Sequence, residues 1–227
     1  MIPLTAGHVL GMGFAQADMT AAYPVTGADS WAGIQEMLNQ VNFAHAELIG
    51  HIAAHAPDIV TARIDLAVAA GDDYVMIPDD LLAVRAIHRV DSGGQRARLD
   101  QFSPDGLQEP RTSAADCPAF SLQGNRIWFS SPWGSAATLE LWYIRSPQRL
   151  LATEDHIKPE IPFGWERYLV AYVAAYLLDK EEGDSRPARA VMAQVIAEIK
   201  DHAMRRAGPR CASRVGRRTE IERLPDP

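Results

Sequence analysis

The sequence predicts an α+β protein: a helical bundle, formed by a long N-terminal helix and a C-terminal αα-hairpin, with an inserted antiparallel β-sheet or small β-barrel. Apolar residues recur with helical spacing at 31–52 and 165–203, whereas the segment between them alternates with the period of two typical of strands. The strands follow one another through hairpin-length connections and do not alternate with helices as in nucleotide-binding folds. These patterns divide the chain into an arm at 1–28, a helical domain at 29–57 and 158–206, an inserted β-rich domain at 58–157 and a basic arm at 207–227.

The first 28 residues are rich in Gly, Ala, Thr and Pro without clear periodicity, which predicts an irregular lead-in and not a packed element. A long amphipathic helix then begins at Asp29 or Ser30, either of which is a suitable N-cap, and Pro57 prevents its continuation. Its apolar positions are Trp31, Ile34, Leu38, Val41, Leu48 and Ile52.

Six or so strands are predicted in the middle of the chain. The first begins near Thr61, where apolar and polar residues alternate up to residue 68. A short run at 74–77 is closed by Pro78, residues 79–82 form a turn or a single helical turn, and extended patterns resume at 83–90 and 96–102. After a long loop at 103–118, the strands 119–123 and 126–130 flank Gly124-Asn125, a pair suited to a tight hairpin turn, and 138–144 forms a further strand.

The closing helices are marked by residues that start and stop helices. The first opens at Trp165, and Gly183 can take the left-handed position after it. Asp184 or Ser185 can cap the second helix, Pro187 is tolerated in its first turn, and Gly208-Pro209 ends it. The first helix is apolar over most of its circumference. Its apolar surface is larger than one small domain needs to bury. We therefore predict a subunit interface on its aromatic residues, Trp165, Tyr168, Tyr172 and Tyr176.

The formal net charge of −7 is distributed unevenly. Residues 205–227 hold seven arginines against three acidic residues, a net charge of +4, so the rest of the chain carries −11. Docking on an acidic protein surface, salt-dependent contact with nucleic acid, and a plain solvated tail are the three interpretations of this segment. Against nucleic acid, the tail has no interleaved aromatic residues for base stacking. The arginines are Arg205, Arg206, Arg210, Arg214, Arg217, Arg218 and Arg223.

Metal and catalytic motifs are weak. Glu47, His51 and His55 share one helix face with zinc-like spacing, but Ile52 occupies the position of a zinc-protease glutamate and no further ligand follows, so a solvated face is the better interpretation. The acidic cluster Asp179–Asp184 lacks the alternation of a calcium loop. Gly11-Met-Gly13 follows no strand and is not a phosphate cradle. The two cysteines, Cys117 and Cys211, form no CxxC motif. We expect neither an enzyme nor a cofactor.

No Lys or Arg precedes Arg63, so the start of the chain lacks the basic residues of a secretory signal or transit peptide. No uncharged apolar stretch approaches the roughly 20 residues that a membrane span needs. These features predict an intracellular protein without a membrane partner.

The order of these parts resembles the head-to-tail connector or adaptor proteins of tailed bacteriophages, over roughly residues 30–206. The likeness is carried by packing and turn signatures and not by catalytic motifs. They are Ser30-Trp31, Leu38-Asn39, Asp73–Leu82 leading into Val84–Val90, Arg126–Trp133 followed by Thr138–Ile144, Ile161–Trp165, and Asp179–Asp184.

The resemblance implies a non-enzymatic virion protein that forms a dodecameric ring in the neck of the particle, below the portal, after assembly in the host cytoplasm. It implies helices against the portal and neighbouring subunits, a β-rich part toward the tail tube or nozzle protein, and a channel in which genomic DNA makes transient contact during ejection. A terminal segment that reaches the portal would correspond to Met204–Pro227, and its portal contacts to Arg205, Arg206, Arg210, Arg214, Arg217 and Arg218. An acidic channel would repel DNA phosphates and let the genome slide. The alternatives are another tail-completion or tail-terminator protein, a metal-dependent enzyme built on Glu47, His51 and His55, and a nucleic-acid binding module.

Overall fold

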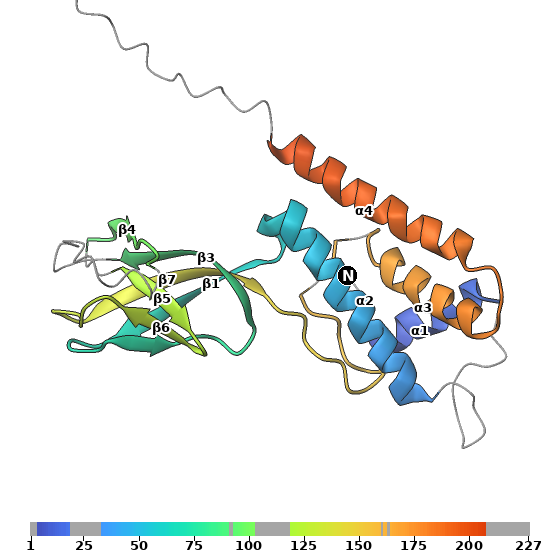
Figure 1. The fold of residues 1–227 in the computed structure, drawn as a ribbon, viewed down its shortest axis with the longest axis horizontal. Helices are drawn as coiled ribbons and strands as arrows, with labels where there is room; N and C mark the ends of the chain where they lie inside the picture. Colours follow the sequence, from blue (N-terminus) through green and yellow to red (C-terminus); the bar gives the residue numbers. More distant parts are fainter. Residues whose placement is uncertain are drawn as a thin grey trace, which may run out of the picture.

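The predicted α+β class is confirmed by a computed structural model, which describes residues 4–18, 33–90, 93–102, 119–159, 161–162 and 164–207. Helices gather at one end of the molecule and strands at the other (Figure 1). The helices are α1 (Ala6–Gln16), α2 (Ile34–His55), α3 (Arg167–Lys180) and α4 (Arg186–Ala207), with a 3₁₀ turn, η2, at Pro57–Ile59. The strands are β1 (Thr61–Val68), β2 (Tyr74–Met76), β3 (Leu81–Val90), β4 (Arg96–Arg98), β5 (Phe120–Gln123), β6 (Arg126–Phe129) and β7 (Ala137–Arg145).

The strands form two antiparallel sheets, with orders β1-β7-β3-β4 and β2-β6-β5. The predicted hairpin between β5 and β6 is confirmed: Gln123 pairs with Arg126, and Gly124 takes the positive φ (61°) that a two-residue connection requires. The last strand, β7, lies between β1 and β3, so its pairing is non-local. Alternate residues of β7, Leu139, Leu141 and Tyr143, enter the core of the β part.

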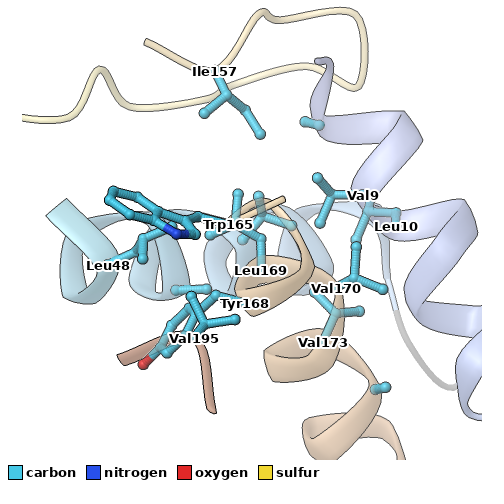
Figure 2. Close-up of a cluster of buried hydrophobic side chains, with 14 of the residues drawn as sticks. Val9, Leu10, Leu48, Ile157, Trp165, Tyr168, Leu169, Val170, Val173 and Val195 are labelled. Atoms are coloured by element: carbon cyan, nitrogen blue, oxygen red, sulfur yellow. The ribbon is translucent and has the colours of Figure 1, made fainter. Parts of the chain in front are cut away.

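The helical part has its own core, built around α3. Residues of α3 pack against α1, α2 and α4, and the cluster also takes in Leu150 and Ile157 from the chain before α3. Figure 2 shows Val9 and Leu10 of α1, Leu48 of α2 and Val195 of α4 around the α3 side chains. Because α3 is covered by helices on several sides, its apolar residues occupy most of its circumference.

The prediction of an irregular lead-in at 1–28 is wrong over residues 6–16, which form α1. Thr5 caps this helix by accepting a hydrogen bond from the backbone N–H of His8 (3.2 Å). One of the glycines that weakened the helical pattern has a packing reason: a Cβ on Gly13 would lie 2.5 Å from Val173 Cγ1 of α3. Only a residue without a side chain permits this close helix crossing. Residues 19–32, which include the predicted N-cap and Trp31, lie outside the described part.

The end of α3 also differs from the prediction, because Glu182 (φ 54°) and not Gly183 takes the left-handed position. The Gly183 N–H donates to the Leu178 carbonyl (2.7 Å) and the Glu182 N–H to that of Asp179 (3.4 Å), which is the Schellman pattern. The start of α4 agrees with the prediction: the Asp184 carboxylate accepts from the Arg186 N–H (3.0 Å), and Pro187 lies in the first turn.

The helical and β parts are joined at η2 and the first residues of β1. The Arg145 N–H donates to the Val60 carbonyl (3.2 Å), and Arg85 of β3 pairs with Asp58 of η2 at 2.5 Å. Ile144 of β7 also packs on the helical core. Within the described residues, no helix combines the length and the apolar character needed to cross a membrane.

Candidate interaction surfaces

The aromatic residues predicted to form a subunit interface lie mainly inside the chain's own helical core. Trp165 and Tyr168 are buried, at 7% and 0% exposure, and Trp165 packs edge-on against His202 of α4. Burial, and then the nearby Glu47 carboxylate, raise the pKa of the Tyr168 phenol. The surplus apolar surface on which the interface prediction rested is therefore covered by the other helices. The subunit interface on these residues stays a prediction.

Tyr176 is half-buried and joins α3 to the start of α2 by a polar contact. Its hydroxyl donates to the Glu36 carboxylate, which also accepts from Lys180 Nζ at 2.8 Å. The lysine, and then the tyrosine, lower the pKa of Glu36, while the carboxylate raises the pKa of Tyr176 to about 12. Tyr172, one turn earlier, is also half-buried, and burial raises its pKa. These two tyrosines keep part of their surface available to a neighbouring molecule.

Two arginines of the predicted portal contact are described, at the C-terminal turn of α4. Arg205 and Arg206 are exposed, and Arg205 pairs with Asp201 one turn earlier at 2.6 Å. Cations at this end of a helix interact favourably with its carbonyl dipoles. Arg210, Arg214, Arg217 and Arg218 lie outside the described residues.

The residues considered as metal ligands make other contacts. His51 lies 3.8 Å from Glu47 and packs edge-on against Tyr168, 6.3 Å between ring centroids. Asp179 accepts from Arg189 at 2.6 Å, and Asp184 from Arg186, so both acidic groups serve the α3–α4 connection. Within the described residues, no group of three or more His, Cys, Asp or Glu side chains is arranged to hold a metal ion.

The outer face of the four-stranded sheet carries a charged cluster that the sequence analysis did not single out. Glu140 of β7 is 1% exposed, yet its Oε2 lies 3.1 Å from Arg96 Nη2 and 3.4 Å from Arg63 Nη2. Its Oε1 accepts from Trp142 Nε1 at 2.5 Å. Both oxygens of this buried carboxylate are thus satisfied by guanidinium and indole groups, as burial of a charge requires.

Next to this cluster is a pocket of ≈ 520 Å³, which we call the arginine pocket. It is lined by Asp58, Thr61, Arg85, Ala86, His88, Arg98 and Trp142. The register of β3 against β7 shifts between Val84 and Ala86, so Arg85 is an extra residue of a β-bulge, a feature that re-aims side chains. In the pocket Arg85 pairs with Asp58 and donates to Thr61 Oγ1 (3.2 Å).

The sequence did contain the signal for this surface. Arg63 and Asp65, Arg96 and Arg98, and Glu140 and Trp142 each recur two residues apart on predicted strands, so each pair shares one sheet face. What the pattern could not supply was the strand order. The structure places Asp65, Glu140, His88 and Arg98 in one row across β1, β7, β3 and β4.

A sequence model described as SU10 adaptor protein matches residues 15–218, about nine-tenths of the chain and most of both the helical and the β parts. The chain belongs to the SU10 adaptor protein family. The predicted relation to phage head-to-tail adaptors is thereby confirmed, and with it a structural adaptor role in a virion, within an oligomeric partnership. No curated protein matches the chain.

Proposed function

We propose that this SU10 adaptor is the head-to-tail connector of a tailed phage. Twelve copies form a ring in the virion neck, below the portal, after assembly in the host cytoplasm. The ring joins the capsid to the tail and lines the channel for genome ejection. The observation that carries the proposal is the family match over residues 15–218, which spans α2–α4, all seven strands and the beginning of the basic tail.

In this arrangement the helical part faces the portal and the neighbouring subunits, and the β part faces the tail tube or nozzle protein. Tyr172 and Tyr176 contribute their remaining exposed surface to the subunit contact, beside the buried Trp165 and Tyr168. The net charge of −11 outside the tail suits a channel through which DNA slides, because acidic walls do not hold phosphates.

The basic tail docks on the portal in this proposal. Arg205 and Arg206 start it as exposed side chains at the end of α4, and Arg210, Arg214, Arg217 and Arg218 continue it in sequence. Guanidinium groups bind carboxylates through paired hydrogen bonds, so an acidic portal surface is the matching partner.

Binding of the full chain to purified portal rings, measured by pull-down and mass photometry, tests both parts of the proposal. We expect a ring of adaptor on the portal, and loss of attachment when the six arginines of the predicted portal contact are replaced by glutamine. The matched control is Arg186→Gln, which removes an exposed arginine of the same helix. Undiminished attachment of the six-glutamine variant would exclude the tail from docking, and a chain that stays monomeric with portal present would contradict the connector role.

A further inference from the structure

The arginine pocket contains one guanidinium, that of Arg98, without a partner among the described residues. Among the described residues, Arg98 makes neither an ion pair nor a hydrogen bond, although it is exposed and lines the pocket. The other arginine of the pocket, Arg85, is held by Asp58 and Thr61. Because the Arg85–Asp58 pair is neutral as a unit, the Arg98 guanidinium adds one positive charge to the lining that no described acidic residue compensates.

We propose that the arginine pocket is a receptor for a single carboxylate, the side chain of one Asp or Glu of a partner protein that is flanked by uncharged residues. The fork of Arg98 offers two parallel N–H groups that match a carboxylate. The partner's side chain would lie against the Trp142 ring. The hydrogen bond from Trp142 Nε1 to Glu140 holds this ring in place. This site is separate from the basic tail, and the proposal does not depend on portal docking.

The charge around the pocket favours a monoanion over a phosphate or a nucleic acid. The buried Glu140 carboxylate is hydrogen-bonded to the Trp142 wall, and Asp58 forms part of the lining. Asp58 is balanced by Arg85, and Glu140 by Arg63 and Arg96, so one carboxylate neutralises the remaining charge of Arg98. The second charge of a phosphate would meet a chain that is strongly acidic outside the tail. A volume of ≈ 520 Å³ is within the range of pockets that bury a compact group, such as one side chain and its neighbours.

The test uses the full-length chain with all seven arginines of residues 205–227 replaced by glutamine, so that the tail contributes no binding. The probe is a rhodamine-labelled peptide with one central glutamate among glycine and serine residues, followed by fluorescence anisotropy at low salt. We expect measurable binding, weakened about tenfold or more by Arg98→Ala, since a charge-assisted paired hydrogen bond is lost. Arg98→Glu should abolish it. The control, Arg149→Ala, removes an exposed arginine outside the pocket and should change the affinity by less than about twofold.

Hydrogen exchange of the same complexes gives a second readout, in which the peptide should slow exchange in β3 and β4 and leave α4 unchanged. Equal loss of affinity in Arg98→Ala and Arg149→Ala would overturn the proposal. So would displacement of the peptide by inorganic phosphate or by a thymidine oligonucleotide at lower concentration than by unlabelled peptide, which would indicate a phosphate site. A fall in particle mass of Arg98→Ala without peptide would identify a second copy of the chain as the occupant, and would equally contradict a foreign partner.

Discussion

The crossing of α1 and α3 at Gly13 gives the sharpest stability prediction. Two effects oppose each other when Gly13 becomes alanine. Helix propensity favours Ala over Gly by about 1 kcal/mol in a helix interior. Against this, the new Cβ would lie 2.5 Å from Cγ1 and 2.9 Å from Cβ of Val173, closer than carbon atoms can approach.

Val173 cannot easily move aside, because it is fully buried and its β-branched side chain has one preferred rotamer in a helix. Overpacking of a core of this kind costs about 1 to 3 kcal/mol. The steric term therefore exceeds the propensity term, and we expect Gly13→Ala to destabilise the chain by about 1 kcal/mol net. The measurement is urea unfolding followed by circular dichroism, with the midpoint and slope compared at equal protein concentration.

Two further variants separate the steric effect from the propensity effect. Gly50→Ala in α2 is the matched control: the site is exposed and its new Cβ meets nothing within 4 Å, so this variant should gain up to about 1 kcal/mol. Val173→Ala makes room for the methyl group, so the double variant should be more stable than the sum of the two single effects. A Gly13→Ala chain stabilised as much as Gly50→Ala would refute the close crossing of α1 and α3.

Three further predictions concern buried or half-buried polar side chains. His45 is fully buried, and burial lowers its pKa from 6.5 to about 4, so the unfolded chain takes up the proton first as the pH falls. Between pH 7 and pH 5 this proton uptake should lower the free energy of unfolding, measured in urea titrations, by about 2 kcal/mol. The variant His45→Leu should lack this pH dependence. Replacing both Arg63 and Arg96 by Ala leaves the buried Glu140 without a cation and should lower the free energy of unfolding by about 3 kcal/mol, more than the sum of the two single replacements. Adding Glu140→Gln should recover part of this loss. Additive effects of the two single replacements would contradict the shared ion pair. Tyr176→Phe removes the hydroxyl that donates to Glu36 and should lower the melting temperature by an amount equivalent to about 1 kcal/mol of stability. Tyr172→Phe serves as the control, because the Tyr172 hydroxyl makes no such contact among the described residues.

Local patterns in the sequence predicted most elements because they follow from backbone geometry. The period of two at 62–68 and the Gly124-Asn125 pair give strands and a hairpin that the structure confirms. The insertion of β7 between β1 and β3 could not be predicted in this way, since it depends on pairs of residues that are 48 to 83 positions apart in the sequence. The arginine pocket depends on that insertion. It also depends on a bulge at Arg85, for which the sequence has no specific marker.

The prediction of an irregular lead-in was wrong because α1 was missed. Glycine lowers helix propensity, so Gly11 and Gly13 concealed a helix, although at Gly13 the absent side chain is what lets α1 approach α3. The apolar circumference of α3, which suggested a subunit interface, is covered by α1, α2 and α4, and Trp165 and Tyr168 are core residues. The subunit interface stays a prediction.

Because the other helices cover most of α3, charged side chains are a better basis than the apolar surface of α3 for contacts between this protein and its partners. Among the described residues, two surfaces with exposed guanidinium groups are the outer face of the four-stranded sheet and the C-terminal end of α4. Both stand on a chain that is otherwise acidic. Exposed ion pairs weaken as salt screens them within about 10 Å at 0.1 M ionic strength, whereas apolar interfaces do not. If partners bind through these guanidinium surfaces, assembly should weaken steeply with added chloride, while salt-insensitive assembly would return the subunit contact to apolar surface on the helices.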